Sequence, residues 1–279
     1  VIGNYREFLA LNKAFEKKQT IRINNLRLKN EEIYYDSIDH IITVTECAKR
    51  SLNQIFHINS DKITVINNGL SKIFKVNKSE ENTDDLKAKY GFDKNEKLIL
   101  FAGNLNARKG VNDLIDVFEK LADRIEFSNI RLILAGRGDY AGTLKIIKKY
   151  WGKITLTGNL DKATLHDFYK MAYMSIVPSY IEQCSYTAIE MMYSGLPIIV
   201  SDVDGLKEIV KDDCGLKVKV DFTKKGASVN FQDLTAKISS VLNDYTTAKM
   251  RAENAKKYAL MHFTSKRMAR ETIAIYKKL

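Results

Sequence analysis

Two glutamates, Glu182 and Glu190, stand on either side of the predicted start of a helix, with seven residues between them. The helix starts near Ser185, Tyr186 and Thr187, whose backbone N–H groups would face a docked anion. A carboxylate accepts two hydroxyl donors at once, which suits a sugar ring or a ribose. The pair therefore indicates a site for a phosphorylated, hydroxyl-rich ligand. A plainer alternative is that Glu182 only caps the helix and Glu190 lies on a solvated face.

Cations precede a second predicted helix, in the segment Gly103-Asn-Leu-Asn-Ala-Arg-Lys-Gly. Arg108 and Lys109 stand just before the helix N-terminus, where a phosphate finds both a positive charge and free N–H groups. For this loop alone, an ordinary turn with exposed cations is the more common explanation. Gly136-Arg137-Gly138 is a weaker signal, because a lone glycine pair is typical of a tight turn.

Both segments follow buried strands, in an alternation of β-branched runs and amphipathic stretches that begins near residue 97. Strands are predicted at 97–102, 130–135, 153–157, 174–177, 197–200 and 215–220, and helices at 111–127, 142–150, 162–171, 186–193 and 205–210. Strands buried on both faces and separated by helices are typical of a parallel doubly wound α/β sheet. Ligands bind such a sheet outside the carboxyl ends of its strands, where these loops lie.

Other elements are predicted on both sides of this sheet. Those before it are strands at 38–45 and 62–66, a helix at 47–56, a turn at Asn67-Asn68-Gly69 and a polar loop at 77–85. Those after it are helices at 231–243, 245–261 and 265–279. We therefore interpret residues 1–72 as the last part of a Rossmann-like domain and residues 73–261 as a complete second domain.

The composition is that of a folded protein with a negatively charged partner. Hydrophobic residues make up 45% and charged residues 28%, which excludes a disordered chain. The net charge of +11 suits a phosphorylated ligand, nucleic acid or an anionic membrane, although dispersed lysines are commonly only solvated surface. No aromatic-interleaved basic stripe favours nucleic acid, and no apolar run approaches the ~20 residues that span a bilayer.

Cysteine and histidine positions indicate neither a disulfide framework nor a metal site. Cys47, Cys184 and Cys214 lie far apart, and their odd number fits a reducing cytoplasm. No Cys/His cluster has metal-ligand spacing, so we expect no bound metal and no cofactor. The chain starts Val-Ile-Gly-Asn, without Met or an apolar signal core, and we expect it to begin partway through a longer protein.

The order of the loop motifs is more specific than any one of them. It runs Gly103…Lys109-Gly110, Gly136-Arg-Gly138, Gly158-Asn-Leu160, Pro178-Ser…Glu182-x7-Glu190, Gly195-Leu-Pro197 and Gly205-Leu-Lys-Glu208-Ile-Val. Over roughly residues 38–220 this order resembles glycosyltransferase family 4 of the GT-B fold. The resemblance implies transfer of a hexose from a nucleotide-diphosphate sugar, most often a UDP-sugar, with retention and without a metal. It also implies that the final helix, 262–279, packs back on the N-terminal domain.

The resemblance implies a role for each matching residue. Lys109 would neutralise the diphosphate leaving group, Glu182 would bind the transferred sugar near the reacting carbon, and Glu190 would hold the ribose. Fixed donors and a cation there would favour the transition state, because negative charge develops on the leaving phosphate. The other implied donor-binding residues are Gly103, Asn104, Arg108, Arg137, Asn159, Leu160, Ser185, Tyr186 and Thr187, with the base near Asn159 and Leu160.

Three departures from the family pattern leave alternatives open. Asn104 stands where the family usually has Arg, Gln183-Cys-Ser185 replaces a Gly-aromatic-Gly, and most of the N-terminal domain has no counterpart. A non-catalytic GT-B partner subunit and a nucleotide-sugar epimerase therefore remain alternatives. The acceptor, which could be a glycan, a lipid or a protein, is not predicted. We expect a cytoplasmic protein, with a possible peripheral contact to the anionic inner face of the membrane.

Overall fold

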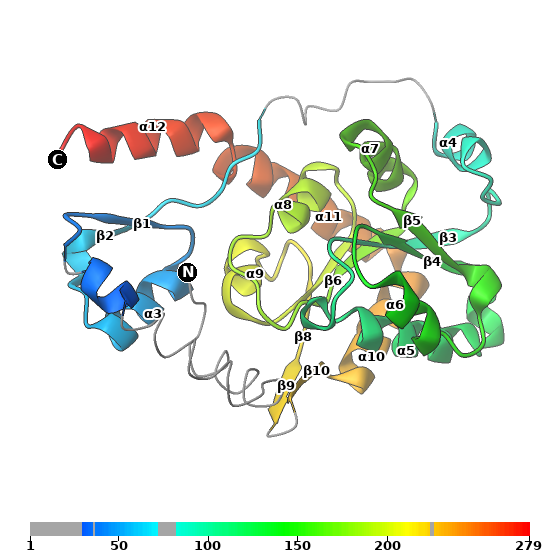
Figure 1. Ribbon diagram of the computed structural model, residues 1–279. Helices are drawn as coiled ribbons and strands as arrows, with labels where there is room; N and C mark the ends of the chain where they lie inside the picture. The colour runs from blue at the N-terminus through cyan, green and yellow to red at the C-terminus, as the bar shows by residue number, and fades with distance from the viewer. Residues whose placement is uncertain (1–29, 36, 72–81, 224–225) are drawn as a thin grey trace.

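The computed structural model describes residues 30–35, 37–71, 82–223 and 226–279, and a six-stranded parallel sheet lies at its centre (Figure 1). The strands are β3 Lys97–Ala102, β4 Ile130–Ala135, β5 Ile154–Gly158, β6 Met174–Val177, β7 Ile198–Ser201 and β8 Leu216–Val218. Their order is β5-β4-β3-β6-β7-β8, so the order reverses between β3 and β6. The predicted doubly wound sheet is confirmed, and its first five strands fall within one residue of their predicted bounds.

Helices cover both faces of this sheet, because the strands are apolar on both sides. Leu98 and Leu100 of β3 point to one face, and Ile99 and Phe101 point to the other, as alternate residues of a strand must. The first face is covered by α7 Lys162–Met171, α8 Tyr186–Tyr193, α9 Asp204–Ile209 and α11 Tyr245–His262. The second face is covered by α5 Val111–Ala122, α6 Tyr140–Ile146 and α10 Phe231–Asn243.

Two helices on the second face are shorter than predicted. Helix α5 ends at Ala122 rather than at 127, because the tight turn Ile125–Phe127 returns the buried Phe127 ring to the core. Helix α6 spans Tyr140–Ile146 rather than 142–150. The reason lies in the buried carboxylate of Glu119, whose Oε1 accepts the amides of Lys148 and Lys149 at 2.8 and 2.7 Å. Because these amides donate to a side chain of α5, residues 148 and 149 do not continue helix α6.

The strand predicted at 215–220 is wrong in its second half. β8 ends at Val218, and β9 Val220–Thr223 pairs instead with β10 Gly226–Val229 in a separate antiparallel hairpin. Lys219 separates the two strands. Its N–H donates to Asp233 Oδ2 at 2.9 Å and its carbonyl accepts from Asn230 N at 2.8 Å, so both backbone groups bond to the start of α10.

The polar loop predicted at 77–85 ends earlier than expected. Residues 77–81 lie outside the described residues, and α4 Thr83–Lys89 begins inside the predicted loop, directly after Asn82. The Asn82 side chain accepts from Asp85 N at 2.9 Å, and Asp84 and Asp85 occupy the first turn. An Asn cap followed by acidic residues is a helix start signal, which the polar composition concealed.

A smaller unit precedes the sheet and meets the C-terminal segment. It contains β1 Ile41–Thr43 and β2 Ile63–Val65, which pair in parallel, and α3 Glu46–Phe56 between them. Leu70 N donates to Phe263 O at 2.8 Å and Ser265 N donates to Leu70 O at 2.9 Å, so the outgoing chain and the returning chain pair at one point. From there α12 Ser265–Tyr276 extends toward the side of β1 and β2 (Figure 1). Within the described residues, no helix is both long and apolar enough to cross a membrane.

The crossing at Leu70 predicts a strong effect of substitution at its neighbour Gly69. A Cβ there would lie 2.3 Å from Thr264 O, a backbone atom that cannot move aside alone. We expect Gly69→Ala to lower the free energy of unfolding by about 1–3 kcal/mol, measured by urea titration. Gly152→Ala is the matched control, because a Cβ at Gly152 meets nothing within 4 Å. Equal midpoints for the two variants would contradict the close packing of this crossing.

Candidate functional site

The reversal of strand order between β3 and β6 brings together the two loops that follow them. In a doubly wound sheet this reversal is where ligands bind. Tyr180 N, after β6, donates to Arg108 O, after β3, at 2.9 Å. Gly110 has φ +68°, and a Cβ on it would lie 2.1 Å from Pro178 O. The two backbones are therefore in direct contact, and only glycine fits at this position.

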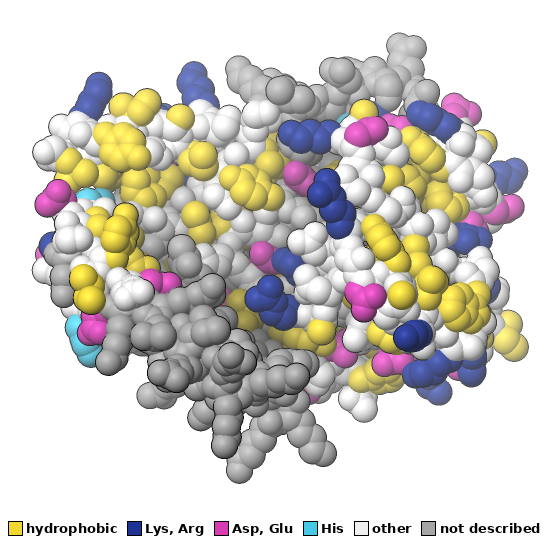
Figure 2. All heavy atoms as spheres, in the orientation of Figure 1, with side chains coloured by type: hydrophobic (Ala, Val, Ile, Leu, Met, Phe, Trp, Pro, Cys, Tyr) yellow, Lys and Arg dark blue, Asp and Glu magenta, His cyan; other side chains and the backbone are white. Residues whose placement is uncertain are grey.

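This contact pairs the cation of the first loop with the first glutamate of the second. Lys109 Nζ forms an ion pair with Glu182 Oε2, and Ser179 Oγ lies 3.4 Å from the same oxygen. The Lys109 and Glu182 side chains are 28% and 17% exposed, so the pair is partly buried but stays accessible. On the face of the molecule that Figure 2 draws, positively and negatively charged side chains lie close together near the middle. Lys109 and Glu182, predicted from separate motifs, meet in one place.

A buried brace that sequence reasoning missed holds the Glu182 loop. The hydroxyl of Tyr180 donates to Asp113 Oδ2 at 2.9 Å, and the same oxygen accepts Val229 N at 2.5 Å. Burial raises the pKa of Asp113, against the lowering effect of these two hydrogen bonds. Burial likewise raises the pKa of Tyr180, so this phenol stays protonated and donates. The brace ties the loop to α5 and to the β9–β10 hairpin.

Glu190 lies one turn into α8, and its surroundings differ from those of Glu182. Its Oε2 accepts the Tyr169 hydroxyl of α7 at 2.8 Å. Burial raises the pKa of Glu190, while the Tyr169 hydrogen bond and Lys162 act in the opposite direction. The alternative of a solvated Glu190 is therefore wrong. The alternative of Glu182 as the helix cap is wrong too, because Ser185 Oγ caps α8 by accepting from Ala188 N at 3.3 Å.

The loops after β4 and β5 join the loop after β3 in close packing, with glycines at their points of contact. Gly103 and Gly136 have φ of +149° and +145°, and a Cβ on Gly136 would lie 1.8 Å from Gly103 O. Leu105 N donates to Arg137 O at 2.6 Å, and Gly136 N donates to Gly158 O at 2.8 Å. The loops after β3, β4 and β5 thus form a continuous layer at the carboxyl ends of the strands.

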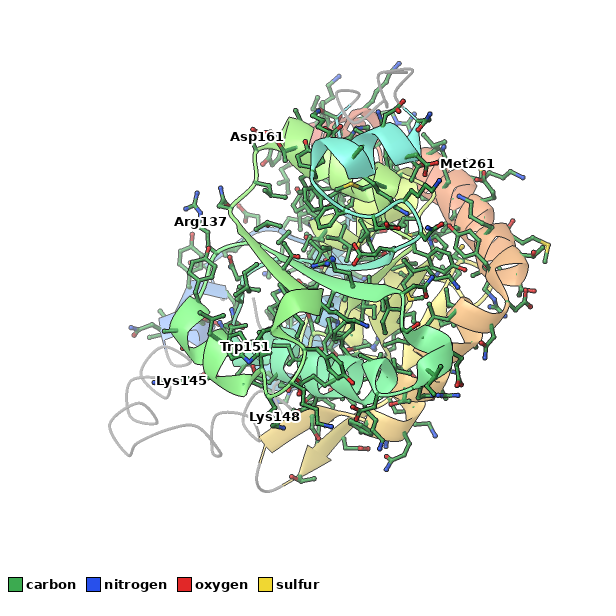
Figure 3. All side chains as sticks on the ribbon, turned by 90° about the vertical axis from the view of Figure 1, so that its right-hand side faces the viewer. Arg137, Lys145, Lys148, Trp151, Asp161 and Met261 are labelled. Carbon is green, nitrogen blue, oxygen red and sulfur yellow. The ribbon has the colours of Figure 1, made fainter. Side chains whose placement is uncertain are left out.

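A pocket of about 660 Å³ opens in this layer. Its polar lining includes Asn104, Asn106, Arg137, Asp139 and Thr143. Figure 3 shows Arg137 pointing outward from the loop after β4. The guanidinium of an exposed arginine at the rim of such a pocket is free to meet an anionic or aromatic group.

The remaining predicted residues are distributed around this layer. Arg108 and Asn159 are exposed, Leu160 packs against the core of the first face, Tyr186 is exposed and Thr187 is half-buried. Arg108 contributes its backbone carbonyl to the contact with Tyr180. Among the described residues, no group of three or more His, Cys, Asp or Glu side chains could hold a metal ion. The three cysteines form no disulfide, and burial raises the pKa of Cys184 to about 11.

Sequence comparisons relate the chain to known proteins. The family model described as glycosyl transferases group 1 matches residues 82–258. An uncharacterized glycosyltransferase of Methanocaldococcus jannaschii is 32% identical over 242 residues, which are 85% of this chain and 59% of that protein. The O-antigen chain mannosyltransferase of Salmonella typhimurium is 27% identical over 209 residues, which are 73% of this chain and 54% of that protein.

Solved structures share the fold. A sucrose-phosphate synthase from Thermosynechococcus elongatus superposes with a TM-score of 0.76 at 23% identity, covering 91% of this chain and 61% of that one. The Anabaena protein HepE in complex with UDP-glucose superposes with a TM-score of 0.75 at 16% identity, covering 90% of this chain and 67% of that one. The fold is thus that of GT-B glycosyltransferases.

The chain spans little more than half the length of the curated relatives described above, 59% and 54%. Its match to the family model nevertheless extends from α4 into α11 and includes the whole six-stranded sheet with its loops. That match covers more than half of the 279 residues. The protein belongs to the glycosyl transferases group 1 family.

Proposed function

We propose that the loops after β3 and β6 bind the diphosphate of a nucleotide sugar, and that the protein transfers the sugar, a hexose, with retention. The observation that carries the proposal is the convergence of Lys109 and Glu182 beside the N-terminus of α8, with Glu190 one turn further on. This places one cation, one helix N-terminus and two carboxylates at the reversal point of the sheet. A diphosphate needs the first two, and sugar hydroxyls suit the last two.

The helix N-terminus supplies further donors for the phosphates. The first amides of an α-helix have no partner within the helix. The Ser185 hydroxyl takes the amide of Ala188, which leaves those of Tyr186 and Thr187 without an acceptor among the described residues. In the proposed complex these amides and Lys109 face the oxygens on which negative charge develops as the glycosidic bond breaks. Donors fixed in advance stabilise that charge without reorganisation.

Glu182 and Glu190 have separate roles in the proposal. Glu182 pairs with Lys109, so each side chain compensates the charge of the other. A bound donor offers its phosphate to Lys109 and its sugar hydroxyls to Glu182. Glu190 accepts the ribose hydroxyls alongside Tyr169. Arg137, Asn159 and Leu160 then lie at the carboxyl ends of β4 and β5, where we place the base.

UDP is the nucleotide that we propose first. The Anabaena neighbour was solved with UDP and with UDP-glucose, and a relative is named a mannosyltransferase. The relatives act on different acceptors by name, so we assign none. Activity without a metal and a peripheral contact with an anionic membrane stay predictions. Donor binding without turnover would favour the partner-subunit alternative. Release of a free sugar would favour the epimerase alternative.

The first test is binding of UDP to the purified chain by calorimetry. We expect binding below millimolar concentration. Lys109→Ala should weaken it about 10- to 100-fold, because the variant loses a charge-assisted hydrogen bond to the phosphate and each 1.4 kcal/mol of binding free energy is worth roughly tenfold in affinity. Glu190→Ala should weaken it as well. Lys148→Ala is the matched control, since Lys148 forms an ion pair with Asp116 on an exposed surface away from the loops. A parent chain that binds none of UDP, GDP or ADP at millimolar concentration would refute the proposal.

The second test concerns the cost of keeping Glu190 ionised. Because burial raises its pKa above the usual 4.5, the folded state binds a proton more readily than the unfolded state. Stability from this group is therefore present below pH 4.5 and is lost as pH rises through the folded pKa. We expect Glu190→Gln, which keeps an acceptor for Tyr169, to be more stable than the parent at pH 7 while binding UDP more weakly.

The stability difference between Glu190→Gln and the parent should shrink as pH falls toward 4.5, measured by thermal unfolding in parallel buffers. Asp116→Asn is the control, because Asp116 is an exposed carboxylate outside the site. A Glu190→Gln variant that is less stable than the parent at pH 7 would show that the carboxylate contributes to folding rather than to binding.

A further inference from the structure

The motif Gly205-Leu-Lys-Glu208 has no role in the proposed donor site, and its glutamate faces another part of the molecule. Glu208 lies near the end of α9 and reaches the N-terminus of α3 in the smaller unit. Its Oε2 accepts Glu46 N at 2.8 Å and its Oε1 accepts Cys47 N at 2.7 Å. Arg50 Nη2 lies 3.3 Å from Oε1. A side chain of the larger domain thus caps a helix more than 150 residues earlier in the chain.

Glu208 completes the cap of α3. Thr45, the local N-cap residue, accepts Ala48 N at 3.2 Å, and the amide of Lys49 bonds to Thr45 O. The amides of Glu46 and Cys47 would otherwise have no acceptor, as the first amides of any helix lack one. A carboxylate also interacts favourably with the positive end of the helix dipole. The smaller unit therefore depends on α9 to complete its only central helix among the described residues 37–71.

A second carboxylate of α9 supports the same contact. Asp204 Oδ1 accepts from Cys47 Sγ at 3.2 Å, and only 3% of Asp204 is exposed. Asp204 has φ +34°, an uncommon conformation for a residue other than glycine. The backbone therefore departs from the ordinary helical conformation at the residue that meets α3. Both ends of α9 contact the first turn of one helix.

Helix α9 is also bound to the loop that carries Glu182. Gly205 N donates to Glu182 O at 3.0 Å, and a Cβ on Gly205 would lie 1.2 Å from Gln183 O. On the other side of this loop, Asn68 Nδ2 donates to Cys184 O at 2.9 Å, which links it to the turn that leaves the smaller unit. The backbone of residues 182–184 is therefore held between α9 and the connection to the smaller unit.

We propose that Glu208 is a positioning residue: it clamps α3 to α9 and so sets the orientation of the smaller unit relative to Glu182. The inference rests on the proposed function, in which Glu182 binds the hydroxyls of the sugar. Glu208 itself touches neither Lys109 nor Glu190 in the structure. Its removal should change the geometry of transfer while donor binding stays as it was.

Amide exchange and a distance measurement test the clamp directly. In Glu208→Ala, exchange at the amides of Glu46 and Cys47 should accelerate at least about tenfold, while the Ala48 amide, held by Thr45, keeps its rate. Nitroxide side chains can be introduced as non-natural amino acids at Gln54 on α3 and Ala236 on α10. The distribution of distances between them should be broader in Glu208→Ala than in the parent. Glu208→Gln, with one carbonyl acceptor left, should lie between Glu208→Ala and the parent in both measurements.

Asp212→Ala is the matched control for these variants. Asp212 is a carboxylate just after α9 whose side chain is 93% exposed and pairs with Lys217, within the larger domain. We expect it to behave as the parent. The proposal would be overturned if the Glu46 and Cys47 amides of Glu208→Ala exchanged at the same rates as in the parent. It would also be overturned if the distance distribution stayed as narrow as the parent's. Acceleration at Ala48 equal to that at Cys47 would overturn it too, because α3 itself would then have unfolded.

Kinetics separate positioning from a general structural role. UDP affinity of Glu208→Ala should stay within about threefold of the parent. In contrast, kcat for sugar transfer should fall by up to about 100-fold, a loss that a displacement near 1 Å can cause. Equal losses in UDP affinity and kcat would overturn the proposal. Should the parent bind no nucleoside diphosphate, the proposed function fails, while the exchange and distance measurements still decide whether Glu208 holds the two units together.

Discussion

The close approach of two backbones at the centre of the sheet governs the arrangement of the candidate site. Where β3 and β6 lie side by side, the chain leaves both strands in the same direction, and the two loops must share one small space. Gly110 makes this possible, because any side chain would occupy the position of Pro178 O. Lys109 comes directly before that glycine and Glu182 follows four residues after that proline, so their contact results from the packing of the backbone. The arrangement of the candidate site thus follows from a steric constraint.

Much of this arrangement could be predicted from the sequence, since local patterns determine it. The β-branched runs predicted the first five strands within one residue, because both faces of the sheet are buried and most strand positions are apolar. The pattern failed where a distant partner decides the structure. Lys219 leaves the sheet because Asp233 and Asn230 bind its backbone groups, and the residues after Ile146 leave the helix because Glu119 accepts their amides. Such partners carry no periodicity that marks them in a sequence.

The candidate site shows the same division. Motif order identified Lys109, Glu182 and Glu190, and their positions at helix starts indicated anion and hydroxyl chemistry. The supports of these residues were not predicted. Tyr180 and Asp113 are separated by 67 residues, and Tyr169 and Glu190 by 21, and neither pair follows a spacing rule. The motif residues could be predicted from the sequence, whereas the residues that hold them in place depend on tertiary packing.

Four buried or half-buried carboxylates fall into two groups, according to the kind of donor that each one accepts from. Glu119 and Glu208 accept backbone amides, which are fixed by the chain and cannot turn away. Glu182 and Glu190 accept from the side chains of Lys109 and Tyr169 instead. A side-chain donor can rotate toward a phosphate or share its acceptor with a hydroxyl at modest cost. A buried carboxylate whose partners can be exchanged is therefore suited to bind a ligand, and one whose partners are backbone amides is suited to hold two elements together.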